Sequence, residues 1–350
     1  MALRQIVYLR ESLLLRSENC NQVFRQFTSQ SKSLRTGRVK FSASSSLKQP
    51  RKQLVPFESH DPGYIDPNKL WKALIFTGTF TVTSFATVSI WEYEKIRSKA
   101  TSVFRSATNF KWVKEKIIGK KEEMSELRRE LQTAWNKLSP GEQLFIPLCA
   151  LNLTVFGMWR IPRLQPFMLK YFCSNPAAKA VCWPMILSTF SHYSAFHIFA
   201  NMYVLHSFSN GAIGSLGKEQ FLGLYLSAGV LSSFASYLYK AVMMQPGLSL
   251  GASGAIMAIL AYVCAKYPDT QLSILFLPMY TFSAGAAIKV IMGLDLAGVI
   301  LGWKFFDHAA HLGGAAFGLF WCYYGSQHLW PKREYLIGHW HKLRGPISKS

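Results

Sequence analysis

Charged residues are scarce in this sequence, and acidic residues are especially few. Only 16% of its 350 residues are charged, whereas about 25% are charged in an ordinary soluble domain. The 18 Asp and Glu residues face 39 Lys and Arg residues, which gives a net charge of +21, although 50% of the residues are hydrophobic. A chain with this composition is a candidate membrane protein, and its basic excess has to be explained by position along the chain.

Several motifs of well-understood chemistry are missing. The six cysteines form no Cys-x-x-Cys pair, which argues against a zinc ribbon or a disulfide framework. The sequence contains no His-Glu-x-x-His and no acid in a Tyr-Asp or Gly-x-Gly-Asp context, so zinc-dependent and aspartyl intramembrane proteases are disfavoured. The pairs His308/His311 and His339/His341 could each share a metal, but neither brings cysteines or a carboxylate cluster. We therefore expect neither a metal nor another cofactor.

Residues 1–53 hold a large part of the basic excess. Eleven basic residues face only Glu11 and Glu18 there, which accounts for +9 of the net charge. Arginines interleave with Leu, Ile, Val and Phe, as is typical of a mitochondrial transit peptide, and Arg10 interrupts the apolar run that a secretory signal would need. A disordered basic tail that binds nucleic acid or anionic lipid is the alternative. We expect an import leader and no nucleic-acid partner.

A first transmembrane helix is predicted at residues 70–91, after a short polar segment at 54–69. A bilayer core about 30 Å thick requires about 20 mostly apolar residues, and no charged residue lies between Ala73 and Trp91. Residues 92–143 are highly charged and helix-prone, with apolar side chains at intervals. This pattern predicts a charged helical linker that can lie along the membrane surface.

Six further spans are predicted in residues 144–324, followed by a polar tail at 325–350. Short connections separate several of them, as in a compact bundle, and the fifth carries charge at a costly depth because it contains Lys289 and Asp295. The predicted fold is an all-α polytopic membrane protein with one extra amino-terminal helix and a six-helix core (1+6). Seven crossings place the two chain ends on opposite sides of the membrane. The predicted core spans are 144–159, 186–208, 221–242, 250–265, 283–303 and 309–324.

Polar side chains inside the core spans are candidate functional groups, because hydrocarbon offers them no water. In the second span, His197 and Asn201 are four residues apart and therefore share one helix face. A His and an Asn spaced in this way more often form a hydrogen bond within a protein core than a functional site. His192 precedes His197 by five residues and is expected to point elsewhere on the helix.

The fourth core span places Ser253 between Gly251 and Gly254, whose small size leaves room for a reacting carbonyl. Only 13 residues run from Ser253 to Ala265, which is about 20 Å of helix. We therefore expect Ser253 to begin a helix partway into the membrane. A hydroxyl at that depth needs a water-filled cavity to take part in hydrolysis.

In the sixth core span, His311, Gly314 and Gly318 follow one another at i, i+3 and i+7 and share one helix face. Small residues on such a face let two transmembrane helices approach closely. If this helix packs on the small face around Ala258, His311 comes to lie next to Ser253. A serine hydroxyl needs such a base before it can attack a peptide carbonyl.

Each pattern is weak alone, but their order is specific. The series His-x-x-x-Asn, Gly-x-Ser-Gly and Ala-His-x-x-Gly-x-x-x-Gly resembles the rhomboid family of intramembrane serine proteases over residues 144–324. The extra amino-terminal span and the transit-like leader are similar to those of mitochondrial members. The residues that carry the resemblance are His197, Asn201, Gly251, Ser253, Gly254, Ala310, His311, Gly314 and Gly318.

The resemblance implies a catalytic dyad, with Ser253 as the nucleophile and His311 as general base and then general acid. His197 and Asn201, together with the backbone N–H of Ser253, would stabilise the oxyanion. The glycines of the three motifs would pack around this active site. No carboxylate is assigned to orient His311, because Asp307 is expected at the end of its span.

The sequence departs from bacterial rhomboids in two places. Where those proteins carry Trp-Arg in the first loop, this chain has Trp183-Pro184, so anchoring of the loop by arginine is expected to be absent. Where they commonly place Tyr four residues after the nucleophile, this chain has Met257. Both departures leave the expected chemistry intact and concern the shape of the loop and pocket.

By this resemblance the chain would be a serine endopeptidase of the mitochondrial inner membrane that cuts single-span proteins within the lipid bilayer. Its substrates would be imported proteins that govern membrane dynamics, including fusion, quality control and cell death. Import by a leader would place the amino terminus in the matrix and the carboxyl terminus in the intermembrane space. The alternatives are a transporter or channel, for which repeats or several broken spans are expected, and an inactive rhomboid-like binding protein, which would normally lack Ser or His.

Overall fold

The computed structural model describes residues 65–108, 126–245, 247–274 and 277–345. The predicted leader at 1–53 and residues 54–64 of the polar segment lie outside the described residues. Contacts divide the chain into two units, of which residues 60–302 together with 307–350 form the larger. All of the helices and strands that the structure describes belong to this larger unit.

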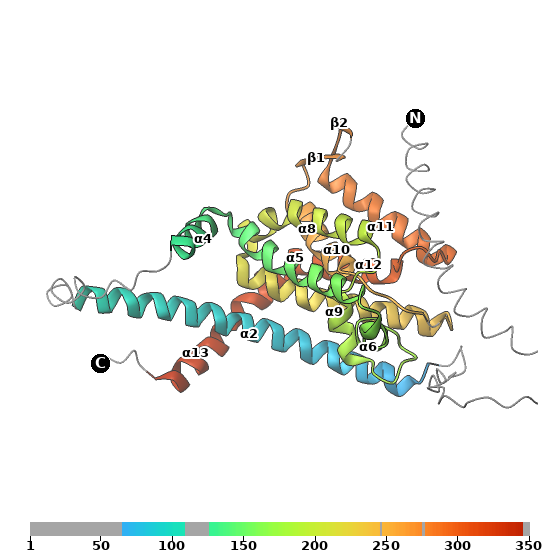
Figure 1. Cartoon of the computed structure of the whole chain (residues 1–350), viewed down its shortest axis with the longest axis horizontal. Coiled ribbons are helices and arrows are strands. Elements are labelled where there is room, and N and C mark those ends of the chain that lie inside the picture. The colour runs from blue at the N-terminus through green and yellow to red at the C-terminus, as the bar shows by residue number, and fades with distance from the viewer. Residues whose placement is uncertain (1–64, 109–125, 246, 275–276, 346–350) are drawn as a thin grey trace, which may run out of the picture. The chain divides into compact units, whose positions relative to one another are not determined.

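The larger unit contains one long helix, a short connecting helix, a helical core and a carboxyl-terminal helix (Figure 1). In chain order the elements are α2 (Pro67–Thr108), α4 (Glu126–Lys137), α5 (Pro140–Met158), η2 (Pro162–Leu164), α6 (Gln165–Tyr171), α7 (Cys182–Leu187), η3 (Ser188–Phe190), α8 (Ala195–Leu216), α9 (Lys218–Val242), α10 (Ser253–Lys266), β1 (Gln271–Ile274), β2 (Leu277–Ser283), α11 (Ala284–Leu301), α12 (His308–Phe320), η4 (Trp321–Leu329), η5 (Trp330–Lys332) and α13 (Arg333–Arg344). The antiparallel pair β1 and β2 departs from the all-α prediction, which otherwise describes these elements.

Four of the described helices, α2, α5, α9 and α11, are long and apolar enough to cross a membrane. The three remaining predicted spans are the ones that carry the candidate site. α8 has 22 residues but includes His197 and Asn201, α10 has only 14 residues, and α12 has 13 before the π-helix η4 continues it. The chain is a polytopic helical membrane protein whose site lies on its shorter or more polar helices.

Helix α2 is longer than predicted. It continues past the expected end at residue 91 to Thr108, because eight of the next 17 residues are Glu, Lys, Arg or Ala, which favour helix. The charged extension also finds a partner, since Lys95 pairs with Glu219 at the start of α9 at 2.7 Å. The predicted boundary between span and linker therefore falls inside one continuous helix.

Helix α5 begins at a strong sequence signal. The Ser139 hydroxyl accepts the N–H of Glu142 at 3.2 Å, and the Glu142 carboxylate accepts the N–H of Ser139 at 2.7 Å. This reciprocal capping box, with Pro140 at the first helical position, satisfies backbone donors that a helix start leaves unpaired. The helix then packs against α8.

The predicted second core span at 186–208 is broken. The chain forms α7 and η3, leaves helical geometry at Ser191, whose φ and ψ are −102° and 129°, and returns to it in α8. Serine favours such breaks because its hydroxyl offers alternatives to helical hydrogen bonds. Here the Ser191 hydroxyl accepts the indole N–H of Trp159 at 2.9 Å. The break moves His192 out of the helix.

Helix α10 occupies the centre of the core. It packs against α8, α9, α11 and α12, and ten of its 14 residues are buried (Figure 1). α12 lies so close that a Cβ on Gly314 would collide with the carbonyl of Gly254, and one on Gly318 would collide with that of Ala258. The prediction that these helices pack through their small faces is therefore correct.

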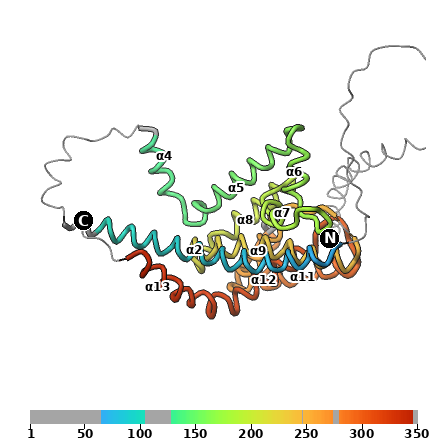
Figure 2. Tube along the Cα trace, turned by 90° about the horizontal axis from the view of Figure 1, so that it is seen from below, coloured from blue at the N-terminus to red at the C-terminus, as the bar shows by residue number. Residues whose placement is uncertain are grey.

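The predicted polar tail is helical as far as Arg344. α12 continues through η4 and η5 into α13, which lies against the carboxyl-terminal part of α2 (Figure 2). The Glu94 carboxylate accepts from the Arg344 guanidinium at 2.9 Å and from the Trp340 indole at 2.8 Å. Arg333 pairs with Glu92 at 3.3 Å. These contacts hold α13 against the part of α2 that directly follows its apolar stretch.

Candidate active site

Ser253 is the first residue of α10, and the segment before it is held in place by the backbone. Gly251 donates its N–H to the Ser188 carbonyl at 2.9 Å, and Ser249 exchanges two backbone hydrogen bonds with Ser174 at 2.8 and 2.9 Å. Gly251 has a φ of +132°, a conformation that favours glycine because it lacks a Cβ. These contacts fix Ser253 at the amino end of a buried helix.

His311 lies one turn into α12 and faces Ser253. Its Nε2 is 2.9 Å from the Ser253 Oγ. The approach of α10 and α12 at their glycines sets this distance, because a side chain on Gly314 would push the two helices apart. The structure thus brings together the two residues that the sequence singled out as nucleophile and base.

A carboxylate that the sequence did not assign lies on the other side of the His311 ring. Oδ1 of Asp295, from α11, is 3.2 Å from Nδ1 of His311 and 2.7 Å from Nδ1 of His308. With its proton on Nδ1, His311 donates to Asp295 while its Nε2 accepts from Ser253. The expectation that no carboxylate orients His311 does not fit this geometry. This contact could have been anticipated from the sequence, because a charged residue inside an apolar span usually has a polar or charged partner.

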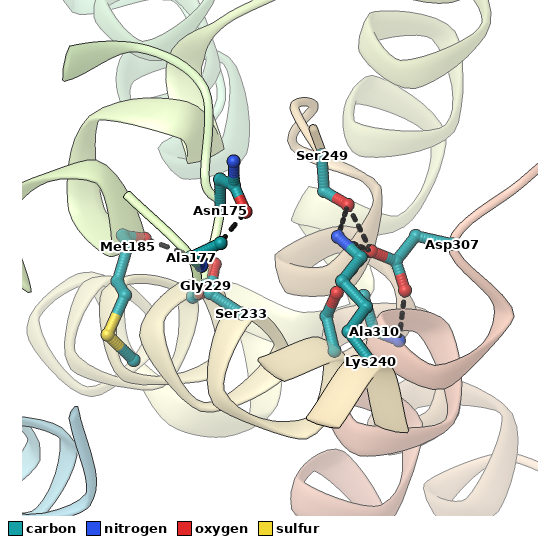
Figure 3. Close-up of polar contacts among 10 residues, drawn as sticks. Asn175, Ala177, Met185, Gly229, Ser233, Lys240, Ser249, Asp307 and Ala310 are labelled. Carbon is teal, nitrogen blue, oxygen red and sulfur yellow. Dashed lines mark hydrogen bonds and ion pairs between the residues drawn. The ribbon is translucent and has the colours of Figure 1, made fainter. Parts of the chain in front are cut away.

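Asp307 caps α12, which agrees with its expected place at the end of a span. Its Oδ1 accepts the N–H of Ala310 at 3.0 Å. Its Oδ2 accepts the Ser236 hydroxyl at 2.5 Å and the Ser249 hydroxyl, and lies 3.5 Å from the Lys240 ammonium (Figure 3). This network ties α9 to the segment before α10 and to the start of α12. It therefore supports both helices that carry the candidate catalytic pair.

His197 and Asn201 lie on one face of α8, at the edge of the site. The His197 ring packs against Gly251, where an added Cβ would be 2.7 Å from its Cε1. The Asn201 side-chain amide donates to the His197 carbonyl at 2.8 Å, which uses one of its two N–H groups. His197 therefore reaches the segment that ends at Ser253, whereas Asn201 is partly engaged by its own helix.

His192 contacts this site, contrary to the expectation that it points elsewhere. Its ring centroid is 4.9 Å from that of His197, and its Nε2 accepts the N–H of Ala252 at 3.3 Å. The prediction was wrong because the helix breaks at Ser191, so the spacing of five residues no longer sets the direction of the ring. His192 is completely buried.

An arginine contacts the end of the first loop although Trp183-Pro184 supplies none. Arg160, just after α5, donates to the Tyr193 carbonyl at 2.5 Å, and its guanidinium lies 4.4 Å from the centre of the Phe156 ring. The expectation that such anchoring is absent was therefore wrong. Trp183 is exposed, and Met257 is buried in a cluster with side chains of α11 and α12.

Comparisons with known proteins give the family to which the sequence belongs. The Rhomboid domain family matches residues 179–328. The presenilin-associated rhomboid-like protein, mitochondrial, of Bos taurus is 49% identical over 297 residues, which is 84% of this chain and 78% of the relative. The Homo sapiens protein of the same name is 48% identical over 297 residues, covering 84% and 77%. This chain belongs to the rhomboid family.

A more distant relative is also named a rhomboid protein. Rhomboid protein 1, mitochondrial, of Saccharomyces cerevisiae is 31% identical over 195 residues, or 55% of this chain and 56% of the relative. The resemblance to the rhomboid family predicted from three short motifs is therefore confirmed, including the similarity to its mitochondrial members. The matched rhomboid domain contains Ser253, Asp295 and His311, as well as the two polar residues of α8.

Proposed function

We propose that this rhomboid is an intramembrane serine protease that cuts peptide bonds in or near the transmembrane helix of another protein. The observation that carries the proposal is the 2.9 Å contact between Ser253 Oγ and His311 Nε2 at the start of a buried helix. Polar groups are costly inside a membrane bundle and tend to mark functional sites. The family of the chain supports the same activity.

The reaction proceeds in two steps. His311 removes the hydroxyl proton of Ser253 at Nε2 while Oγ attacks the scissile carbonyl carbon, and it then gives this proton to the leaving amine as the C–N bond breaks. In the second step a water molecule loses its proton to His311 and attacks the acyl carbon, and the proton returns to Oγ as Ser253 is released. Every transferred proton passes through Nε2, so Nδ1 must keep its own proton.

Asp295 is the positioning residue that keeps the proton on Nδ1 of His311. Its Oδ1 accepts from Nδ1 and stabilises the positive charge that the ring acquires during the reaction. The contact requires α11 and α12 to lie close together at this level. Gly298, one turn after Asp295, permits this, because a Cβ there would be only 2.5 Å from Cγ of His308. The catalytic pair is therefore assisted by a carboxylate from a third helix.

The oxyanion is stabilised at the amino end of α10. The first N–H groups of a helix have no intrahelical partner, so the backbone N–H of Ser253 is a natural donor. His197 packs beside Gly251, and Asn201 has a second amide hydrogen to offer. In another serine protease the loss of one such donor costs about 2.7–4 kcal/mol of transition-state stabilisation.

The substrate is a single-span membrane protein whose helix opens easily. A transmembrane helix hides its carbonyls in hydrogen bonds, so small or helix-weakening residues at the cut make attack easier. The names of the relatives place them in mitochondria, which supports an import leader and a location in the inner membrane for this chain. The substrates then are imported proteins, with effects on membrane dynamics, quality control and cell death.

The amino terminus lies in the matrix and the carboxyl terminus in the intermembrane space. At the start of α2, Lys69 donates to the Ala177 carbonyl at 3.0 Å. At its other end, Glu94 binds Arg344 of α13. Because α2 is long enough to span, these contacts support chain ends on opposite sides of the membrane.

The catalytic pair belongs to the half of the bundle where α2 begins. Ala177 contacts the start of α2, Ser174 precedes it by three residues, and Ser174 pairs with Ser249, four residues before Ser253. With the amino terminus in the matrix, the active site faces the matrix half of the membrane.

The decisive experiment compares the purified wild type with Ser253→Ala and His311→Ala on a fluorogenic transmembrane substrate in liposomes. Both substitutions should abolish cleavage, because each removes an atom through which the proton passes. Ser207→Ala is the matched control, since this serine of α8 is exposed and bonds its own helix. A fluorophosphonate should label the wild type and Ser207→Ala but not Ser253→Ala. Equal cleavage by all four proteins would end the protease proposal.

The same liposomes test the two alternatives. A transporter or channel moves solute or ions across them while labelling of Ser253 fails. An inactive rhomboid-like binding protein retains the transmembrane substrate without cutting it. Either result, obtained with folded protein, would replace the proposed activity.

A further inference from the structure

Two imidazoles and one carboxylate converge next to the catalytic pair. His308 and His311 are three residues apart and share a face of α12, and that face meets Asp295 of α11. One ligand atom from each of the three residues can be chosen so that all lie within 4.8 Å of one another. Only the two histidines are close together along the sequence. The fold brings the carboxylate of Asp295 to them from another helix.

These three groups match the ligands that Zn²⁺ prefers. Zinc sites with three protein ligands and an open fourth position are built from imidazole nitrogens and carboxylate oxygens. With metal–ligand bonds of about 2.0–2.1 Å, ligand atoms in a tetrahedral site are about 3.3 Å apart. The two observed separations from Oδ1 of Asp295 are 2.7 and 3.2 Å, so small side-chain shifts are enough to admit the ion.

A second observation at the same place points to a cation. The side chain of Asp295 is only 8% exposed, and among the described residues its Oδ2 has no hydrogen-bond donor. A buried carboxylate oxygen without a donor is costly. A divalent cation bound by both oxygens of the carboxylate would satisfy it, whereas the two histidines reach only Oδ1.

We propose that Asp295, His308 and His311 form an inhibitory Zn²⁺ site in this protein. A neutral imidazole carries one proton on its two nitrogens. If Zn²⁺ takes the lone pair of Nδ1 in His311, that proton is on Nε2, and Nε2 no longer accepts the proton of Ser253. Zinc bound by Asp295 also removes the carboxylate's hydrogen bond to Nδ1 of His311. The inhibition, though not the binding, rests on the protease activity proposed above.

The ion reaches this site from the side of the catalytic pair. The side chain of His311 is 15% exposed, compared with 8% for Asp295 and 6% for His308. His311 is therefore the most exposed of the three ligands. Its ring lies between Asp295 and Ser253. Zinc binding should consequently be reversible by a chelator in the aqueous phase.

Binding is tested first on the full chain carrying Ser253→Ala, so that proteolysis plays no part. Calorimetric titration of the chelator-treated protein with ZnCl₂ should show one site. His308→Gln in the same background keeps a donor for Asp295 but loses the ligand, and should weaken binding by at least about 10-fold. His339→Ala is the matched control, because this exposed histidine of α13 lies outside the cluster. Absence of binding, or binding that His308→Gln leaves unchanged, would overturn the proposal.

Inhibition is tested second, on the enzyme with Ser253 intact. ZnCl₂ at about ten times its dissociation constant should lower the cleavage rate about tenfold, because only the unloaded fraction reacts. EDTA should restore the rate, and the inhibition constant of His308→Gln, relative to its own metal-free rate, should rise in parallel with its dissociation constant. If His308→Gln unfolds, Asp295→Asn in the Ser253→Ala background replaces it in the titration. Zinc bound with full activity retained would overturn the inhibitory role, and zinc bound to a wild type that cleaves nothing would refute only the protease activity.

Discussion

Nδ1 of His311 lies 3.2 Å from Oδ1 of Asp295, on the opposite side of the imidazole from the Ser253 hydroxyl. Three helices therefore meet at one ring, because Ser253 begins α10, Asp295 belongs to α11 and His311 to α12. The orientation of His311, the proposed base, depends on how α11 packs against α12. This dependence leads to predictions about the carboxylate, the helix contact and the network that supports them.

Asp295→Asn should slow cleavage while leaving the substrate bound. An amide has no charge to stabilise the protonated ring, and its N–H₂ favours the tautomer with the proton on Nε2. Replacing the carboxylate of a serine protease triad lowers kcat by about 10⁴-fold, which is the upper limit here. We expect kcat to fall at least about tenfold with little change in KM. The measurement is the cleavage rate against substrate concentration in liposomes.

The split between kcat and KM separates positioning from a purely structural role. A positioning residue acts on His311 and not on the substrate, so its loss should leave KM nearly unchanged. Thermal unfolding of the same protein shows whether the fold survives. A rise in KM alongside the loss of kcat, together with a lower melting temperature, would speak against the positioning role.

Gly314→Ala should destabilise the protein although alanine favours helix. Its Cβ would collide with the Gly254 carbonyl, so α10 and α12 must separate. Overpacking of this kind costs about 1–3 kcal/mol, which should lower the melting temperature. Cleavage should fall as well, because the same contact sets the distance between Ser253 and His311.

Gly293→Ala is the matched control for this prediction. Gly293 lies on an exposed face of α11, and a Cβ there meets no atom within 4 Å. The same substitution should therefore be neutral or stabilising by up to about 1 kcal/mol. Equal melting temperatures for the two variants would contradict the close packing of α10 and α12.

Asp307→Ala should cost more stability than the loss of a helix cap. A cap contributes about 1 kcal/mol, but the substitution also leaves Lys240 without its carboxylate, and the Lys240 side chain is only 11% exposed. Breaking a fully buried ion pair costs about 3–5 kcal/mol, and the 21% exposure of Asp307 places the expected loss below that range. Asp307→Asn should retain the cap, because its amide oxygen still accepts the N–H of Ala310, but should lose the ion pair and the two serine hydroxyl bonds that Oδ2 accepts.

A double-mutant cycle with Lys240→Met measures the pair directly. Lys240→Met removes the unpaired charge, so the double variant should be more stable than the sum of the two single losses implies. Chemical or thermal unfolding in detergent gives the four stabilities. Additive losses would show that Lys240 and Asp307 do not interact in the folded protein.

The proposed topology predicts which positions an impermeant maleimide reaches. In a chain whose native cysteines are replaced, Glu130→Cys of α4 should be labelled in mitochondria whose outer membrane is ruptured. Trp183→Cys of α7 should be labelled only after the inner membrane is opened. A protease-sensitive tag after Ser350 should behave like Glu130→Cys. The reverse pattern would invert the orientation.

The membrane made much of the architecture predictable. A helix in hydrocarbon needs a long apolar run, so α2, α5, α9 and α11 were found by length and composition. Their ends were less predictable, because the charged residues after position 91 continue α2 to Thr108 through their own helix propensity. The break at Ser191 was missed because its hydroxyl is bonded by Trp159, a residue 32 positions earlier.

The pair at the centre of the site was predictable for the same reason. Ser253, His311 and the small residues around them stand out in an apolar sequence, where each polar or glycine residue needs a local explanation. Small faces on two helices implied their contact, and the structure has it at Gly254 and Gly314. From the sequence, Asp295 stood out only as a charged residue inside a predicted transmembrane span.

The sequence alone determined the membrane class, most of the spans and the residues of the Ser-His pair, because helix periodicity and the cost of polarity in lipid act within single segments. Only the tertiary structure decided that Asp295 and His192 belong to the site. Asp295 reaches His311 across the contact of α11 with α12, and His192 reaches His197 because the chain leaves helical geometry before α8. Both positions depend on packing between segments, which no local pattern encodes.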